Sequence, residues 1–255
     1  MTSVEHARDD WDTHWEHYSE ESKDNPAVRM RVNLVLASLA LGKAPARVID
    51  IGSGQGDFVA ALVDRHPHVE ALGIELSHAG VDIATIKVPS ARFVQRDLMT
   101  AELPPPTLLR WATHATCSEV LEHVDDPVIL LRNAAAYMAD GCRLIVTVPG
   151  GPMSAFDHHL GHRGHFTRAR LRSVLEAAGF GVEYVSGAGF PFFNLYRLMV
   201  VARGRKVIED ATATTAAGTS KPVMAVMRLF SFLFRFNLPP SRLGWQVVAV
   251  ARLER

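Results

Sequence analysis

The stretch Val48-Ile49-Asp50-Ile51-Gly52-Ser53-Gly54-Gln55-Gly56-Asp57 decides the fold of this chain. An apolar, β-branched run ends in an acid, glycines follow at every second position, and a helical pattern starts at Asp57. This order predicts a buried strand, a tight turn and the first turn of a helix. Glycine is favoured where a Cβ would clash in a sharp turn or against a ligand. The free N–H groups at the start of the helix attract an anionic or polar ligand.

The glycine spacing distinguishes this turn from a dinucleotide-binding turn. The pattern here is G-x-G-x-G, whereas the dinucleotide pattern is G-x-G-x-x-G. Phe58 and Val59 follow Asp57, so no third glycine stands where a pyrophosphate turn needs one. The sequence therefore predicts a nucleoside pocket without a diphosphate.

Three further polar segments follow apolar runs in the chain. They are Gly73-Ile74-Glu75-Leu76-Ser77, Gln95-Arg96-Asp97-Leu98 and Cys117-Ser118-Glu119-Val120-Leu121-Glu122-His123. In this order and at this spacing, and together with Asp50 to Asp57, they resemble the motifs of class I S-adenosylmethionine-dependent methyltransferases. The resemblance is to the small-molecule type, similar to quinone and secondary-metabolite methyltransferases. It covers residues 45–187 and a last strand near 245–253.

The resemblance implies an α/β fold of Rossmann-like type. We expect a seven-stranded, mostly parallel sheet with one antiparallel edge strand, an N-terminal helical lid and a helical insertion before the last strand. The expected divisions are a lid at 1–44, an S-adenosylmethionine-binding core at 45–188, an insertion or cap at 189–243 and the last strand of the core at 244–255.

The resemblance also implies which residues bind S-adenosylmethionine. Glu75 would accept hydrogen bonds from both ribose hydroxyls, and a buried carboxylate without such partners would be unfavourable. Leu76 would lie against the adenine, and Asp97 would accept from its amino group beside the Leu98 backbone. Arg29 would bind the donor's carboxylate; the alternative is a solvated surface arginine. The full expected set is Arg29, Asp50, Gly52, Ser53, Gly54, Gly56, Glu75, Leu76, Asp97, Leu98, Cys117 and Ser118.

Histidines supply the candidate catalytic bases, because imidazole titrates near neutral pH. His123 follows the fourth expected strand, and His162 belongs to a cluster after the fifth that also contains Asp157. Asp157 with His162 is similar to a D-x-x-x-G-H segment of small-molecule members of the family. The alternatives are a packed histidine at a helix start for His123, and a loop held by histidine-to-backbone hydrogen bonds for the cluster.

A divalent metal ion is a further hypothesis for this region. Glu119, Glu122 and His123 form E-x-x-E-H, and quinone O-methyltransferases and small-RNA 2′-O-methyltransferases place a divalent ion with a similar pattern. Carboxylate and imidazole together suit Mn²⁺, Fe²⁺ or Zn²⁺ better than Mg²⁺. The pattern also occurs in metal-free relatives, so both alternatives stay open.

Composition limits the classes of protein that fit. The 255 residues are 48% hydrophobic, and 27 basic residues balance 27 acidic ones. A formal net charge of zero argues against a nucleic-acid partner. Two cysteines in apolar runs indicate reduced thiols, so we expect a cytoplasmic protein. No apolar run reaches the length of a membrane span.

Two segments outside the expected core carry aromatic side chains. Trp11, Trp15 and Tyr18 recur at helical spacing, which favours a packed helix or a lid over the donor. The apolar arm at 223–238 is rich in phenylalanine, and the stretch 210–220 before it is expected to be flexible. This arm completes the core or forms a homodimer seam, receives a lipophilic acceptor as a lid, or contacts a membrane surface peripherally.

The function predicted from these observations is methylation of a small, apolar or aromatic acceptor on oxygen, nitrogen or carbon, as in quinone or secondary-metabolite biosynthesis. The alternatives are an RNA or protein methyltransferase and a non-catalytic scaffold that binds the donor. Neutral charge and the lack of an N-P-P-Y-type tetrad count against RNA, and the intact glycine turn counts against a scaffold.

Overall fold

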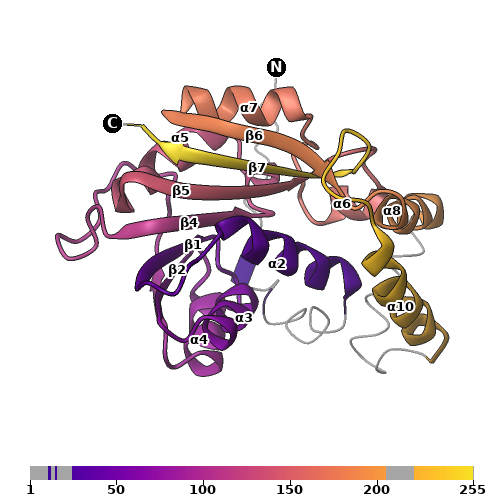
Figure 1. Ribbon diagram of the computed structural model, residues 1–255, viewed down its shortest axis with the longest axis horizontal. Helices are drawn as coiled ribbons and strands as arrows, with labels where there is room; N and C mark the ends of the chain where they lie inside the picture. Colours follow the sequence, from indigo (N-terminus) through magenta and orange to yellow (C-terminus); the bar gives the residue numbers. More distant parts are fainter. Residues whose placement is uncertain (1–10, 13–14, 16–24, 205–220, 255) are drawn as a thin grey trace, which may run out of the picture.

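The computed structural model describes residues 11–12, 15, 25–204 and 221–254, so Tyr18 and the stretch 210–220 lie outside the described residues. A seven-stranded sheet in the order β3-β2-β1-β4-β5-β7-β6 forms the centre of the molecule (Figure 1). Its strands are β1 (Ala46–Ile51), β2 (Val69–Glu75), β3 (Arg92–Gln95), β4 (Ala112–Ser118), β5 (Met138–Pro149), β6 (Phe180–Ala188) and β7 (Gln246–Leu253).

The strands β1 to β5 pair in parallel, which confirms the Rossmann-like prediction. β7 is the expected antiparallel strand, and it lies between β5 and the outermost strand β6, antiparallel to both. Seven of its eight residues are buried, as a strand covered on both faces requires.

Two hydrophobic clusters fill the space between the sheet and its helices. Side chains alternate along each strand, so Ile49 joins one cluster and Val48 the other. Helices α2 (Pro26–Leu39) and α3 (Asp57–Arg65) pack on one face, with α4 (His78–Lys87) on the same side (Figure 1). Helices α5 (Pro127–Ala134) and α7 (Arg168–Ala177) cover the other face.

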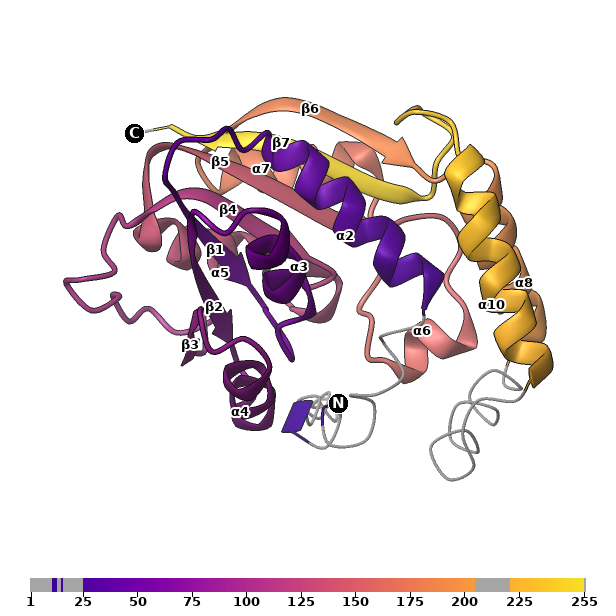
Figure 2. The same ribbon diagram turned by 60° about the horizontal axis from the view of Figure 1, so that its bottom comes forward.

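The remaining helices lie beyond the carboxyl ends of the parallel strands. They are the short α6 (Ala155–His159), α8 (Phe192–Arg203) and α10 (Lys221–Leu233). Figure 2 shows α8 and α10 side by side at this edge, with α6 and the N-terminal end of α2 close to them. The 3₁₀ turns are η1 (Leu121–His123), η2 (Ala135–Tyr137) and η3 (Phe234–Phe236). This arrangement places helices beside the carboxyl edge of the parallel strands (Figure 1 and Figure 2).

Candidate active site

The glycine turn between β1 and α3 has a backbone that only glycine adopts readily. Gly52, Gly54 and Gly56 have φ values of 69°, 51° and 81°, all in the left-handed region. Space is also limited, because a Cβ on Gly52 would collide with Val120. A Cβ on Gly54 would lie 2.5 Å from Cζ2 of Trp15. The turn therefore offers bare backbone to whatever lies above it.

The Glu75 carboxylate joins this turn to the start of the next helix. Its Oε2 accepts a hydrogen bond from Gly54 N at 2.7 Å, and its Oε1 accepts one from Ser77 N at 3.0 Å. Glu75 is almost fully buried, and burial raises the pKa of its carboxyl while the backbone donors oppose that shift. Each oxygen keeps further lone pairs for a ligand.

Asp50 lies at the end of β1 beside Thr116 of β4. Thr116 Oγ1 donates to Asp50 Oδ1 at 2.6 Å, and the two residues are neighbours in the sheet. Burial raises the pKa of Asp50 to about 7, helped by the charge of Glu75 and opposed by the Thr116 hydroxyl. A cationic group beside Asp50 would favour its ionised form.

Residues 11, 12 and 15 have helical backbone and lie over the turn. The Trp15 ring contacts the position of Gly54 and comes within 3.1 Å of a Cβ built on Gly80. Asp12 Oδ1 accepts from Ser77 Oγ at 2.5 Å and from Ala79 N at 3.1 Å. The hydrogen bond from Ser77 is the main reason that the pKa of Asp12 is lowered. These contacts cover the region where the motifs converge.

Three histidines form a row beside the same edge. Trp11 contacts His123 edge-on with ring centroids 4.8 Å apart. His123 and His162 are 4.7 Å apart, and His162 and His165 are 5.5 Å apart. His123 ends η1, whereas the other two lie in the loop between α6 and α7. The structure thus brings both predicted bases together.

Hydrogen bonds along the row select the histidine tautomers. His165 Nδ1 is 3.0 Å from the Gly151 carbonyl oxygen, which can only accept, so Nδ1 of His165 carries a proton. In neutral His165 the Nε2 is then an acceptor, and it lies 3.4 Å from His162 Nδ1. His162 therefore donates from Nδ1 and keeps the lone pair of Nε2. Burial lowers the pKa of His162 to about 4, against the pull of Asp157, so this ring is neutral at pH 7.

Asp157 is the acid that faces these rings. Its Oδ2 lies 3.6 Å from His165 Nε2, and its Oδ1 lies 4.0 Å from His162 Nδ1. Arg197 of α8 pairs with it at 2.7 Å, and Ser154 donates to it through N and Oγ. These donors lower the pKa of Asp157, although burial opposes them. Asp157 therefore positions the loop and is an ionised partner of the row.

Arg197 is a site residue that the sequence analysis missed. It is the only charged residue of α8 before its last position, and Asn194 is the one other strongly polar side chain in residues 192–202. An isolated charge in an apolar helix indicates an internal ion pair. That signal was available in the sequence, although the identity of the partner was not.

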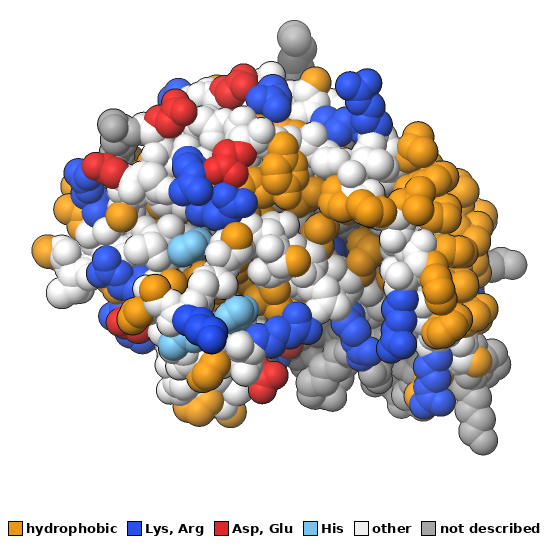
Figure 3. Space-filling view, in the orientation of Figure 1, with side chains coloured by type: hydrophobic (Ala, Val, Ile, Leu, Met, Phe, Trp, Pro, Cys, Tyr) orange, Lys and Arg blue, Asp and Glu red, His pale blue; other side chains and the backbone are white. Residues whose placement is uncertain are grey.

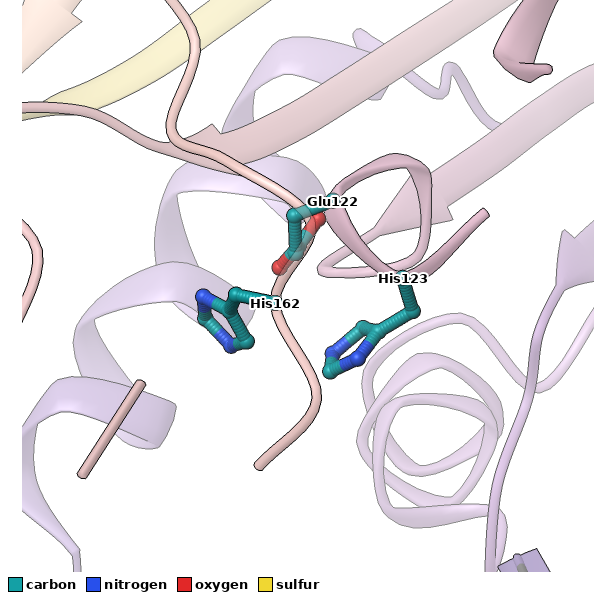
Figure 4. A group of neighbouring side chains, drawn as sticks. All are labelled: Glu122, His123 and His162. Carbon is teal, nitrogen blue, oxygen red and sulfur yellow. The ribbon is translucent and has the colours of Figure 1, made fainter. Parts of the chain in front are cut away.

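Glu122 is a buried carboxyl beside two of the histidines. Its side chain and those of His123 and His162 point toward one another (Figure 4), and one ligand atom from each lies within 4.8 Å of the others. Glu122 is 1% exposed, and neither carboxyl oxygen has a hydrogen-bond partner within the described part of the chain. Burial, with the nearby charge of Glu119 second, raises its pKa well above the usual 4.5.

Glu119 does not belong to this group. Its Oε1 accepts from Gln246 Nε2 at 2.8 Å, and its Oε2 lies 3.7 Å from Arg31 Nε. The hypothesised metal site of Glu119, Glu122 and His123 is therefore changed in one residue. The structure brings His162, and not Glu119, close to Glu122 and His123. A second group shares His162 and contains Asp157 and His165.

The remaining predicted donor-binding residues differ in exposure and in their partners. Leu76 is 40% exposed, which leaves its side chain available to a ligand. Arg29 is exposed on α2, whereas Arg31 faces Glu119. Asp97 caps its own turn by accepting from Met99 N, and Ser118 Oγ lies 2.7 Å from Thr147 Oγ1. Ser53, Leu98 and Cys117 are buried.

Comparison with known proteins identifies the family of this site. A family model described as a methyltransferase domain matches residues 26–185. The chain belongs to the methyltransferase domain family. S-adenosylmethionine, the cofactor expected from the motifs, is the methyl donor of its class I members.

Two curated relatives are similar to this methyltransferase. It is 30% identical over 140 residues to trans-aconitate 2-methyltransferase of Methylobacterium nodulans, which covers 55% of this chain and 50% of that protein. It is 28% identical over 169 residues to ubiquinone biosynthesis O-methyltransferase of Aeromonas salmonicida, with 60% and 70% covered. The match thus spans half of the first relative's length.

A solved structure shows the same fold. Phosphoethanolamine N-methyltransferase 2 of Haemonchus contortus, in complex with S-adenosyl-L-methionine, superimposes with a TM-score of 0.61 at 16% identity. The match covers 95% of this chain and 57% of that one.

Glu122 makes a testable contribution to the stability of this methyltransferase. The pKa of Glu122 is raised in the folded protein. Above about pH 4.5 the unfolded chain therefore loses a proton that the native protein keeps, and the free energy of unfolding falls as pH rises. Glu122→Gln removes this loss. In urea unfolding with a chelator present, the stability of the variant relative to wild type should rise between pH 5 and pH 8, by at most about 1.4 kcal/mol per pH unit.

Glu119→Gln is the control, because Glu119 is already paired with Gln246 and Arg31. A difference between wild type and Glu122→Gln that does not change with pH would contradict the raised pKa.

Proposed function

We propose that this methyltransferase transfers a methyl group from S-adenosylmethionine to a small, lipophilic acceptor, with His162 as the general base. The main support is that the glycine turn and the histidine row are both contacted by the same N-terminal segment. Trp15 contacts the glycine turn, and Trp11, four residues earlier, contacts His123 of the histidine row. Because Trp11 and Trp15 are four positions apart in the chain, the glycine turn and the histidine row lie close to each other.

The fit of the donor rests on the chain's own groups. The left-handed glycines leave room that a Cβ would fill, and Glu75 keeps lone pairs for the ribose hydroxyls. Asp50 lies where it would meet the cationic end of the donor, which would ionise its carboxyl. Arg31 joins Arg29 as a candidate partner for the donor's carboxylate. Trp11, Asp12 and Trp15 would close over the bound donor as a lid that excludes water.

The chemistry requires alignment and a base. The donor supplies a methyl group already activated on a sulfonium, so no protein nucleophile is needed. His162 takes the proton of an acceptor hydroxyl at Nε2, while its Nδ1–H is held by His165. His165 is in turn held by the Gly151 carbonyl. Asp157 balances the imidazolium that forms.

The acceptor class follows from charge and from the relatives. Arg197 is paired with Asp157, so it is not left to attract an anionic acceptor. The aromatic residues of α8 and α10 border the same edge. One relative is named as an O-methyltransferase of ubiquinone biosynthesis, and a lipophilic acceptor agrees with the aromatic side chains at this edge.

The first test concerns Glu75. Glu75→Gln removes the charge that holds the ribose, so the Kd for S-adenosylmethionine should rise roughly ten- to a hundredfold in calorimetry, as expected for hydrogen bonds to a charged group. Glu70→Gln on the same strand is the control, because Glu70 is exposed. Wild-type affinity in Glu75→Gln, with an unchanged melting temperature, would refute the ribose contact.

The second test concerns His162. His162→Ala should lower kcat on a phenolic acceptor by about 10²-fold or more while the donor Kd stays unchanged, since general-base catalysis typically contributes that much. His159→Ala, at the end of α6 three residues before His162 and exposed, should keep wild-type turnover. Because the pKa of His162 is about 4, the rate should stay flat on acidification until well below pH 6.5. Unchanged kcat in His162→Ala removes this residue as the base.

The same acceptor panel separates the rival functions. Methylation of a peptide or an RNA instead of a small molecule would favour those substrate classes. Donor binding without turnover on any acceptor would favour a scaffold.

A metal-assisted variant of the reaction is favoured by the unpartnered Glu122 carboxyl. Glu122, His123 and His162 fit a divalent ion of the Mn²⁺, Fe²⁺ or Zn²⁺ type, because they offer one carboxylate and two imidazoles at close range. Such an ion would supply Lewis acidity that lowers the pKa of an acceptor hydroxyl. In that case His162 would be a ligand and the base would lie elsewhere in the row.

Thermal shift measures this alternative directly. Adding Mn²⁺ to chelator-washed protein should raise the Tm of wild type and of Glu119→Gln, and it should leave the Tm of Glu122→Gln unchanged, since binding to the native state alone stabilises it. Equal shifts in the wild type and in Glu122→Gln, or no shift in any protein, would rule out this ion site.

A further inference from the structure

The outer face of α8 and α10 carries a continuous set of exposed apolar side chains. On α10 and η3 they recur every three or four residues, so they line one side of the helix. Figure 3 shows hydrophobic side chains gathered over these helices, with Lys and Arg side chains beside them. The exposed set is Leu195, Leu198, Met199, Val226, Leu229, Phe232, Phe236, Leu238 and Leu243, which we call the hairpin face.

The side chains of the hairpin face differ from those that pack α8 against α10. Phe193, Tyr196, Phe230 and Phe234 contact one another with ring centroids 5.3–5.9 Å apart, and these rings join α8 to α10. Phe230 is 3% exposed, whereas Phe232 is 53% exposed. The apolar surface of α10 therefore extends well beyond what its contact with α8 requires, and an exposed patch of this kind marks an interaction site.

Charges along the hairpin face are of one sign. Arg228 and Arg235 are exposed and lie seven residues apart, on the polar side of α10 and η3. The described stretches 184–204 and 221–253 contain no Asp or Glu, although the whole chain is neutral. Apolar side chains bordered by arginines, without acids, are typical of helices that lie in the interface of an anionic bilayer.

The face is also connected to the site. Arg197 of α8 makes the ion pair with Asp157, and α6 packs against α8. A surface that bound through α8 and α10 would lie beside the carboxyl edge of the sheet. None of the helices that the structure describes is long and apolar enough to span a bilayer, so binding would be peripheral.

We propose that the hairpin face docks on the surface of an anionic lipid bilayer and so brings the site to an acceptor dissolved in the membrane. The acceptor part of this inference rests on the proposed function, whereas the docking itself does not. A flat, laterally extended surface suits a face that is apolar, basic at its border and free of acids. A second copy of the chain is a poorer partner, because two such faces would bring arginines of like charge together.

Vesicle co-sedimentation tests the docking without any catalysis. Wild type should bind vesicles of mixed phosphatidylcholine and phosphatidylglycerol and should bind pure phosphatidylcholine much more weakly. Leu229→Glu with Phe232→Glu should abolish binding. Arg228→Gln with Arg235→Gln should weaken binding to the mixed vesicles roughly thirtyfold at low salt, at about 1 kcal/mol for each basic residue.

Ile86→Glu is the matched control, because Ile86 is an apolar residue on α4 that is 84% exposed and lies outside the hairpin face. It should bind like wild type. Donor affinity and turnover on a water-soluble acceptor should stay unchanged in the Leu229→Glu, Phe232→Glu variant, which separates failed docking from failed catalysis.

Two results overturn the proposal. One is the absence of vesicle binding by the wild type. The other is a wild-type dimer, detected by light scattering, that the Leu229→Glu, Phe232→Glu variant no longer forms although it still binds vesicles. That result would assign the hairpin face to contact with a second copy of the chain.

Discussion

The Glu75 carboxylate, held by the backbone of Gly54 and Ser77, is the interaction on which the site depends. It fixes two turns from different strands relative to each other at the same edge of the sheet. The glycine turn supplies bare backbone, and the turn before α4 supplies a helix start that Asp12 also contacts. A single buried carboxylate thus ties the two turns of the proposed donor site together, and a buried, satisfied hydrogen-bond network is rigid.

The histidine row adds chemistry to this frame through tautomer selection. The Gly151 carbonyl fixes the proton of His165, and His165 fixes the proton of His162. The lone pair of His162 is therefore on Nε2, and the ion pair of Asp157 with Arg197 ties the loop to α8. Glu122 lies on the other side of the same ring as a neutral acid or as the ligand of a cation, and this choice decides whether His162 serves as a base.

Much of the fold could be predicted from local sequence. The strand, glycine turn and helix at Val48 to Asp57 and the acid at the end of β2 follow from short-range patterns, whereas the antiparallel direction of the last strand was implied by the resemblance. The inward position of Arg31 could be predicted as well, because Arg31 lies four residues before the buried Val35 on α2, whereas Arg29 is exposed. Helical spacing therefore places Arg31, and not Arg29, on the inward side of the helix.

Long-range partners could not be predicted. The pairing of Asp157 with Arg197 joins residues 40 positions apart, and that of Glu119 with Gln246 joins residues 127 positions apart. Neither partner leaves a signal at its counterpart. The same holds for the unpaired state of Glu122, because the E-x-x-E-H pattern does not say which of its two acids turns inward.

The position of β7 has a consequence for how the protein is made. On the ribosome, β5 and β6 emerge before the α8–α10 insertion, and the strand that joins them emerges after it. Trp245 and Gln246, at the start of that strand, bond Gly150 and Glu119 beside the reactive groups. The proposed acceptor side of the site therefore depends on contacts that the chain can make only after β7 has been synthesised, whereas β1 and β2, which carry the glycine turn and Glu75, come from its first third.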